Sequence, residues 1–229
     1  MLVIDSIFLF LFFIIRRLIM FKKTLCALSL ISVSYAAFSA PVANLKVTGS
    51  ITPPTCTIDN QNEVDVEYKF DTAPSMFPLS GNLTLTPVSK KIEIVCDATT
   101  YLSFEAKDNR SDSPMTAADT NFGLGKFGTD GSKNIGFYTI NMKNATVKAD
   151  SEDAGKQTGI RSGTLFSAAQ ALVKKTNKTA WAISSTQLAS GQIFAADFEV
   201  TPTLSEDLKN SSGDVSLDGH AVLSFGFGI

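Results

Sequence analysis

Short segments in which apolar and polar residues alternate recur along much of the chain. They lie at residues 64–70 (VDVEYKF), 91–96 (KIEIVC), 101–106 (YLSFEA), 135–142 (IGFYTINM), 179–184 (TAWAIS) and 193–200 (IFAADFEV). In the last segment, the alternate apolar positions are Phe194, Ala196, Phe198 and Val200. Because successive side chains of a β-strand point to opposite faces, each segment is predicted to be a strand with one apolar face.

Clusters of Gly, Pro, Asn, Asp and Ser separate the predicted strands. The largest clusters lie at residues 72–82, 107–116, 128–134 and 150–159. Residues of these types favour turns. Many short strands between such turns predict one all-β domain, an antiparallel sandwich or barrel, with no repeat and no second domain.

The segment 165–175 (LFSAAQALVKK) is the one helix candidate in the sequence. Its apolar residues Leu165, Ala168, Ala169 and Leu172 have helical spacing. A buried strand with polar flanks has the same composition, so the pattern leaves both interpretations open.

The two ends of the predicted domain carry the most regular alternation. Near the C-terminus, one face of residues 217–229 would carry Leu217, Gly219, Ala221, Leu223, Phe225, Phe227 and Ile229. Near the N-terminus, Leu45, Val47, Gly49 and Ile51 alternate with polar residues until Pro53 and Pro54 end the pattern. Unpaired strand edges invite another chain to add on, so both ends are predicted to be interaction surfaces unless the fold pairs them internally.

A secretory signal peptide is predicted at residues 20–39. Lys22 and Lys23 form its basic region, residues 24–38 its apolar region, and small residues follow for a signal peptidase. Cleavage after Ser39 is favoured over cleavage after Ala40, which would leave Pro41 next to the cut. We therefore expect export, with an N-terminal extension at residues 40–54 and a domain at residues 55–229.

Residues 1–19 form a second hydrophobic element in front of this signal. Their uninterrupted apolar run, residues 7–15, is much shorter than the ~20 residues of a membrane-spanning helix. We interpret the segment as an upstream start, with Met20 as the true start. The alternative is an extended signal or an inner-membrane anchor.

Charge and cysteine content narrow the function further. Removing residues 1–39 takes away four of the 20 basic and one of the 22 acidic residues and leaves a net charge of −5. This charge argues against a nucleic-acid partner. Cys56 and Cys96 remain, and in an oxidising compartment an even pair predicts a disulfide, which contributes roughly 4 kcal/mol for a loop of this length.

Several short motifs suggest chemistry, but each has a simpler explanation. Residues 123–128 (GLGKFG) match a phosphate-loop pattern without the following helix, so a Gly-rich hairpin is favoured. His220, with Ser216 and Ser224, is expected on a polar strand face, and Trp181 in the core. The acidic residues Asp150, Glu152 and Asp153 lack EF-hand spacing and are expected in a solvated loop. We predict no catalytic residue, metal site or cofactor, and therefore no enzyme.

The order of motifs resembles chaperone–usher fimbrial (pilus) subunits. Gly49, Ser50 and Ile51 are followed by Cys56 and, 40 positions later, by Cys96. With "SITPPTC", "KDNR", "FGLG" and the ending "SLDGHAVLSFGFGI", the chain after Met20 is most similar to a family of exported fimbrial-like proteins of Gram-negative bacteria. The aromatic Phe227 is third from the end and Gly219 eleventh, whereas common pilus subunits have an aromatic next to last and a glycine fourteenth from the end.

The resemblance implies an incomplete immunoglobulin-like sandwich whose open groove lies beside the C-terminal strand. A periplasmic chaperone would lend a strand to this groove, and at the outer-membrane usher the N-terminal strand of the next subunit would replace it. The donor residues would be Leu45, Val47, Gly49 and Ile51, with Gly49 allowing close packing. The border of the acceptor groove would be the apolar face of residues 217–229.

The resulting hypothesis is a structural subunit that is exported to the periplasm, assembles head to tail into a fimbrium at the cell surface and contributes to adhesion. The alternative is a solitary secreted or periplasmic β-sandwich that binds a ligand and keeps its N-terminal strand folded onto itself.

Overall fold

The computed structural model describes residues 42–211 and 214–228. The predicted signal peptide, residues 1–19 and Ile229 lie outside the described residues. The described chain divides into a short N-terminal unit, which ends at Ser50, and a domain that begins at Ile51. In the part of the chain that the structure describes, no helix combines the length and the apolar character needed to cross a bilayer.

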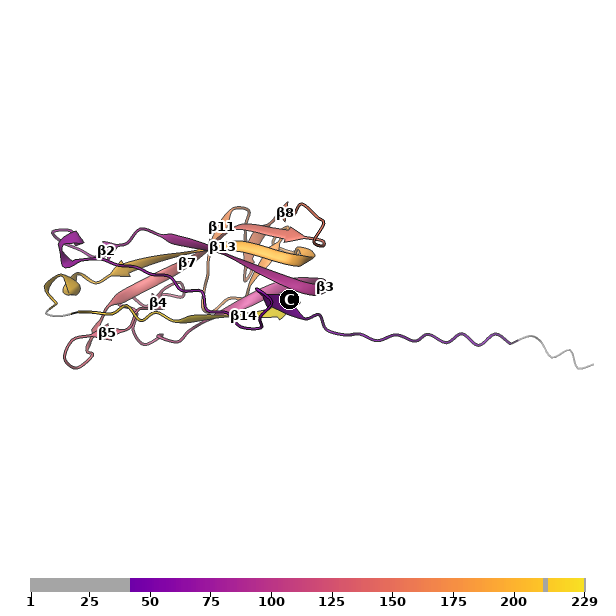
Figure 1. Ribbon diagram of the computed structural model, residues 1–229, viewed down its shortest axis with the longest axis horizontal. Helices are drawn as coiled ribbons and strands as arrows, with labels where there is room; N and C mark the ends of the chain where they lie inside the picture. The colour runs from indigo at the N-terminus through magenta and orange to yellow at the C-terminus, as the bar shows by residue number, and fades with distance from the viewer. Residues whose placement is uncertain (1–41, 212–213, 229) are drawn as a thin grey trace, which may run out of the picture. The chain divides into compact units, whose positions relative to one another are not determined.

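The domain is all-β, as predicted, and its strand ladders are antiparallel (Figure 1). The strands are β1 (Cys56–Ile58), β2 (Leu83–Thr84), β3 (Val88–Asp108), β4 (Phe122–Gly123), β5 (Lys126–Phe127), β6 (Lys133–Asn134), β7 (Gly136–Lys148), β8 (Lys156–Gln157), β9 (Gly159–Ser162), β10 (Leu165–Ser167), β11 (Gln170–Leu172), β12 (Thr179–Ala182), β13 (Ser190–Leu204) and β14 (Ala221–Phe227). The short 3₁₀ helices η1 (Pro74–Met76) and η2 (Glu206–Asn210) follow β1 and β13.

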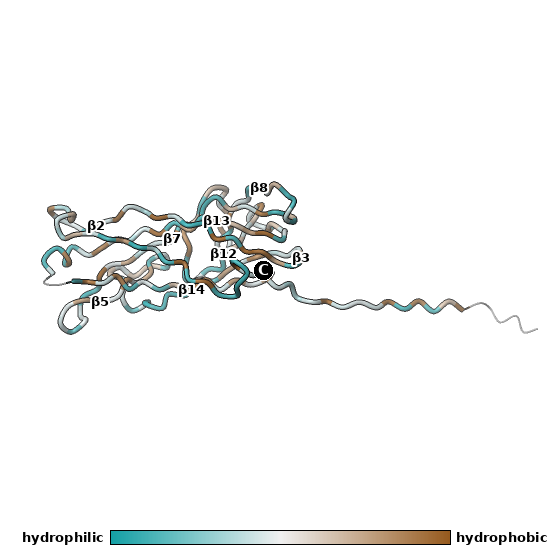
Figure 2. The backbone as a smooth tube through the Cα atoms, in the orientation of Figure 1, coloured by the Kyte–Doolittle hydropathy of each residue, from teal (hydrophilic) through white to brown (hydrophobic). Residues whose placement is uncertain are grey.

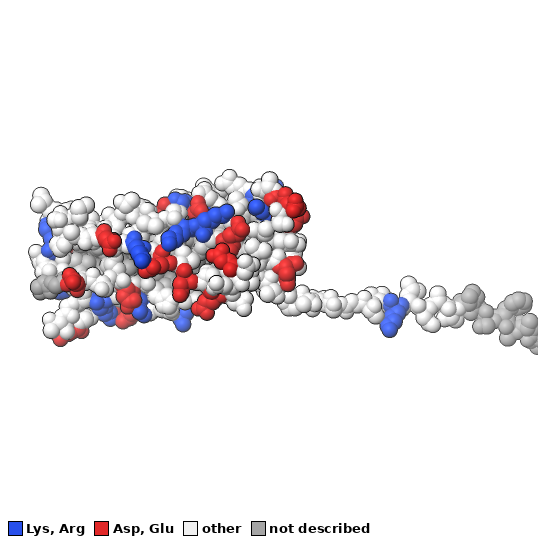
Figure 3. Space-filling model, in the orientation of Figure 1, with Lys and Arg blue, Asp and Glu red and all other residues white. Residues whose placement is uncertain are grey.

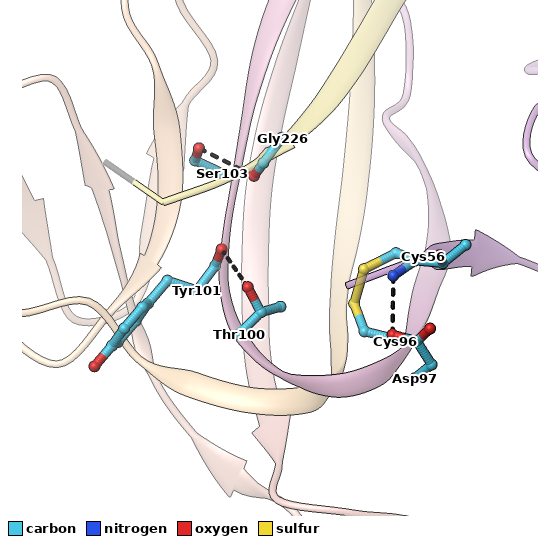
Figure 4. The surroundings of a disulfide bond; sticks show 8 residues. Cys56, Cys96, Asp97, Thr100, Tyr101, Ser103 and Gly226 are labelled. Carbon is cyan, nitrogen blue, oxygen red and sulfur yellow. Dashed lines mark hydrogen bonds between the residues drawn. A yellow bond between two sulfur atoms is a disulfide. The ribbon is translucent and has the colours of Figure 1, made fainter. Parts of the chain in front are cut away.

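The long strand β3 bends at residues 97–101 and so contributes to both layers of a sandwich (Figure 4). Its first half pairs with β1 and β13, and β13 in turn pairs with β7. Its second half pairs with β12 and β14. The two segments predicted as separate strands, 91–96 and 101–106, are therefore the two halves of one bent strand.

An aromatic cluster packs the two layers together. Phe104 contacts Phe198 across the layers with ring centroids 5.7 Å apart, and Trp181 contacts Phe194 at 5.6 Å. The indole Nε1 of Trp181 donates to the carbonyl oxygen of Ala195 at 3.0 Å. Apolar and polar positions alternate along the long strands, as the colouring of Figure 2 shows. Trp181 and the predicted apolar face of β13 are buried, so these predictions are confirmed.

The helix predicted as one possibility at residues 165–175 is wrong, and so is the single buried strand. The segment instead contains β10, which pairs with β9, and β11, which pairs with β7. Leu165 and Leu172 are exposed. Each half of the segment forms hydrogen bonds with the free edge of a different layer, and this pairing overrides the local helical spacing.

The predicted strand at residues 64–70 has no strand assignment and pairs with no other strand among the described residues. Its alternation is nevertheless real, because Val64, Val66, Tyr68 and Phe70 are half-buried and the residues between them are exposed. Residues 42–55, which include the predicted N-terminal strand, likewise have no strand assignment. The regular part of the C-terminal strand is limited to β14.

The domain has two distinct ends (Figure 1). We call the end with η1 and η2 the tip. The base is the opposite end, with the Cys56–Cys96 disulfide and the bend of β3. About ten residues of β13 separate its pairing with β2 from its pairing with Val95, so tip and base lie about 33 Å apart.

Candidate strand-binding groove

An open groove with a volume of about 1260 Å³ extends along the domain from base to tip. Residues 62–72 form one border and run from β1 toward η1. Residues 214–227 form the other border and run from η2 toward the base, where Phe227 pairs with Leu102. The two borders therefore run in opposite directions.

The floor of the groove is apolar. Its buried residues are Ile92, Ile94, Leu102, Leu124, Tyr138, Ile140, Phe198, Val200, Leu204 and Leu208. Half-buried apolar side chains line the walls, namely Val66, Tyr68 and Phe70 on one side and Leu217, Leu223 and Phe225 on the other. An occupant would therefore have to present apolar groups to the floor.

The C-terminal border is an unpaired strand edge. Among the described residues, β14 has β3 as its only partner strand. The amide of Asn109 donates to the carbonyl oxygen of His220, and the amide of Gly228 donates to that of Tyr101. In an antiparallel ladder the backbone groups of alternate residues point to the same side. Residues 220, 222, 224, 226 and 228 therefore direct their backbone groups toward β3. The alternate residues Ala221, Leu223, Phe225 and Phe227 direct their N–H and C=O groups into the groove.

The same alternation continues before β14. The amide of Asp218 donates to the carbonyl oxygen of Leu124 at 3.0 Å, on the side away from the groove. Leu217 and Gly219 consequently point their backbone groups toward the groove. The structure thus brings together the described members of the predicted acceptor set, 217 to 227, on one free edge.

Polar contacts outside the groove fix the position of this border. The guanidinium of Arg110 donates to both carboxylate oxygens of Asp218, at 2.9 and 3.0 Å. The buried carboxylate of Asp108 in turn accepts hydrogen bonds from the amides of Arg110 and Gly123. Lys175 Nζ lies 3.7 Å from Asp108 Oδ2. The border is therefore held in place without using its groove-facing edge.

Gly219 marks the place where this border passes directly over the floor. A Cβ atom there would lie 2.8 Å from Tyr138 Cε1 and 3.2 Å from Leu124 Cδ2. The ring of Tyr138 is stacked on Phe122, with centroids 5.4 Å apart, and has little room to retreat. Burial raises the pKa of Tyr138, with a smaller contribution from the charge of Asp108. The absence of a side chain at Gly219 is what permits this close approach.

The opposite border, residues 62–72, has free backbone groups as well. Within residues 42–211 and 214–228, no backbone hydrogen bond connects it to another strand. It is held by side chains, of which Tyr68 donates its hydroxyl proton to the carbonyl oxygen of Phe198 at 2.8 Å. Burial raises the pKa of Tyr68 to about 12, and the nearby charge of Asp197 adds to the shift.

The predicted disulfide between Cys56 and Cys96 is present and lies at the base (Figure 4). Next to it, the amide of Thr55 donates to Asp97 Oδ1 at 2.9 Å, and the amide of Asp97 donates to the carbonyl oxygen of Thr55 at 3.0 Å. The point at which the chain enters the domain is therefore fixed at Thr55.

The predicted donor residues are exposed. The exposed fractions of Leu45, Val47 and Ile51 are 91%, 97% and 101%, and a Cβ atom at Gly49 would meet nothing within 4 Å. Leu45, Val47 and Ile51, with Gly49 between the last two, occupy every second position from 45 to 51, so they form a segment able to bury one apolar face against a partner.

The other candidate residues behave as their simpler explanations predict. His220 is exposed, and its Nδ1 lies 3.3 Å from Asn109 Nδ2. Residues 123–134 contain the β5–β6 hairpin. Asp150 and Asp153 accept backbone amides in an exposed loop, and these bonds from Ala149 and Gly155 lower the pKa of Asp153. No cluster of potential metal ligands occurs among the described residues.

Sequence reasoning did not identify the groove floor or the border at residues 62–72 as parts of the site. The floor residues belong to several strands, and their alternation is that of any core residue. Residues 64–70, which form most of this border, were predicted as an ordinary strand. No local sequence signal distinguishes an alternating segment with unpaired backbone groups from a strand that pairs with neighbours on both sides.

A scan of protein-family models and a search of curated proteins found no match to this chain. On the face shown in Figure 3, positive and negative side chains are interspersed over the domain. The groove, its free edges and its apolar floor are therefore the features from which a function is argued.

Proposed function

We propose that the protein is a structural fimbrial subunit whose groove is completed by an N-terminal strand supplied by a second copy. The observation that carries the proposal is an apolar groove bordered by a strand edge with unpaired backbone groups. A strand in this position satisfies both features at once, because its backbone pairs with the edge and its alternate side chains reach the floor.

The size of the groove suits one strand. A strand of nine residues is about 30 Å long, which for a volume of about 1260 Å³ leaves a cross-section of about 40 Å². The strand and sheet spacings of about 4.8 and 10 Å give one strand a cross-section of about 48 Å². Residues 43–51 have this length and the required alternation.

The direction of the inserted strand follows from the geometry of β14. Antiparallel pairing is slightly more stable per residue than parallel pairing, and β14 offers the longest regular edge. A strand antiparallel to β14 enters at the base and ends at the tip. The chain's own N-terminal strand is tethered at Thr55, at the base, so in its own groove it would run parallel to β14. Antiparallel insertion therefore favours a strand from another copy.

The energetics are sufficient for a long-lived contact. Burying Leu45, Val47 and Ile51 would contribute roughly 1.5 to 3 kcal/mol each. Each main-chain hydrogen bond to β14 would add about 1 kcal/mol net. Because donor and acceptor are different surfaces, the contact is head-to-tail and produces an open filament.

The proposed assembly route follows the resemblance to chaperone–usher subunits. A free edge above an apolar floor is an aggregation hazard, so a periplasmic chaperone would cover the groove. At the outer-membrane usher, the N-terminal strand of the next subunit would then replace the chaperone. The filament would then stand at the cell surface and contribute to adhesion.

A synthetic peptide tests this function directly. The mature chain lacking residues 40–52 is mixed with a peptide of residues 42–52, and the thermal unfolding midpoint is measured. Because the peptide would bind only the folded state, it raises the midpoint. At a free peptide concentration 100 times the dissociation constant, the folded domain is stabilised by about 2.7 kcal/mol. A Gly49→Val version of the peptide is the control and should stabilise less, because its added side chain has to fit above the floor.

No shift with the parent peptide, for a truncated domain that folds, would contradict the proposal. A solitary ligand-binding sandwich remains as the alternative in that case, with the groove as its binding site.

A further inference from the structure

We propose that the tip of one copy docks on the base of the copy whose N-terminal strand it holds, with Met76 and Leu79 as the apolar contacts. This inference rests on the proposed strand exchange and adds a second contact surface to it.

Met76 and Leu79 are unusually exposed for large apolar side chains. Their exposed fractions are 66% and 99%; Met76 is the last residue of η1, and Leu79 lies between η1 and β2. Residues 74–79 lie at the tip end of the groove, where Pro74 and Phe77 line it. Together Met76 and Leu79 present apolar surface at one end of the domain that a partner surface could bury.

Polar contacts hold this exposed segment in place. Lys209 Nζ donates to the carbonyl oxygens of Pro78 and Leu79, at 3.0 and 3.1 Å. The amide of Gly81 donates to Glu206 Oε2 at 2.8 Å. A segment that is already anchored loses little conformational freedom on binding, which favours its use as a contact.

The length of the tether identifies the partner. If Ile51 is the last residue in the groove, only Thr52, Pro53 and Pro54 precede Thr55, which is fixed to Asp97 at the base of its own domain. Four residue steps span at most about 14 Å. Because an antiparallel strand leaves the groove at the tip, the base of the donor copy must lie within about 14 Å of the acceptor's tip.

The base offers apolar surface for this contact. Val95 and Tyr101 flank the bend of β3 and are 43% and 47% exposed. Both lie within four residues of Asp97, which holds the exit of the tether. Tip and base therefore carry exposed apolar groups at the positions that strand exchange brings together.

Cysteine cross-linking tests this contact. Leu79→Cys and Thr99→Cys are combined in one mature chain, which is treated with a short bismaleimide and then heated in SDS. The two positions lie at opposite ends of the domain, and tip and base are about 33 Å apart, so a short cross-link forms between copies. The matched control combines Thr99→Cys with Leu165→Cys, an equally apolar exposed position on β10.

A short tether raises the local concentration to about the millimolar range, so we expect roughly tenfold more cross-linked dimer from the 79/99 pair than from the control. Unheated gels of the same samples report strand exchange separately. SDS-resistant oligomers with equal cross-linking of both pairs would overturn this inference and leave the proposed function intact. The absence of such oligomers would overturn both.

Discussion

Tyr68 shows how a single side chain can hold a groove border that lacks backbone partners. Its hydroxyl donates to the carbonyl oxygen of Phe198, and its ring lies among the apolar wall residues. Since ionisation would remove the donated proton and place a charge in an apolar wall, burial raises the pKa of Tyr68 to about 12 from the usual 10.0.

The raised pKa predicts a loss of stability at alkaline pH. Below pH 10 tyrosine is protonated in both states, and its contribution is fully present. Between pH 10 and about 12 the unfolded chain releases the proton while the folded chain keeps it, so the free energy of unfolding falls as pH rises through this window.

Urea unfolding at a series of pH values measures this effect. In the Tyr68→Phe variant, the free energy of unfolding should fall less steeply between pH 10 and about 12. The remaining fall is the contribution of Tyr138, whose pKa is also raised by burial. An identical decline in parent and variant would show that Tyr68 is not buried against the groove wall.

Strand β14 is the element on which the proposed contact depends. Its backbone groups face two sides in alternation, toward β3 and toward the groove. A proline removes one N–H group, and its effect therefore depends on the side that this group faces.

Adjacent proline substitutions are predicted to have different effects. Ala221→Pro removes an N–H that faces the groove, at the first residue of the strand, and should leave the fold stable. It should weaken binding of the donor peptide about fivefold, the equivalent of one hydrogen bond of about 1 kcal/mol. Val222→Pro removes an N–H that pairs with Lys107 and should lower the free energy of unfolding.

Peptide titration and urea unfolding of both variants test the assignment. Equal losses of stability in the two variants, or unchanged peptide affinity for Ala221→Pro, would be incompatible with a groove-facing edge at Ala221.

At the scale of elements, the alternating pattern predicted the all-β fold and the buried face of β13, because both depend on local spacing. The disulfide was predicted separately, from the even pair of cysteines expected in an oxidising compartment. The alternating pattern did not predict the fate of residues 64–70, whose alternation reflects burial of one face and not backbone pairing. It was also wrong for residues 165–175, whose pairing with two separate edges is set by the topology of the whole domain.

The candidate site was predictable in part for the same reason. The apolar face of residues 217–229 has a strict local period, and its described members line one edge of the groove. The floor residues come from distant strands, and the Arg110–Asp218 ion pair joins residues 108 positions apart. Such contacts have no signature within a single segment.

At the scale of the molecule, tip and base have complementary roles in the proposed filament. The tip carries the exit of the groove and the exposed Leu79, while the base carries the fixed exit of the N-terminal strand at Thr55. A head-to-tail arrangement uses every one of these features in each subunit.

An unheated, non-reducing SDS gel tests the central claim most directly. A chain of residues 40–229, exported to the periplasm of an expression host, is compared with a variant that lacks residues 40–52 and with the donor variant Gly49→Val. We expect a ladder of SDS-resistant oligomers for the parent, a weaker ladder for Gly49→Val and none for the truncated chain. A single monomer band for the folded, chaperone-free parent would contradict strand exchange between copies.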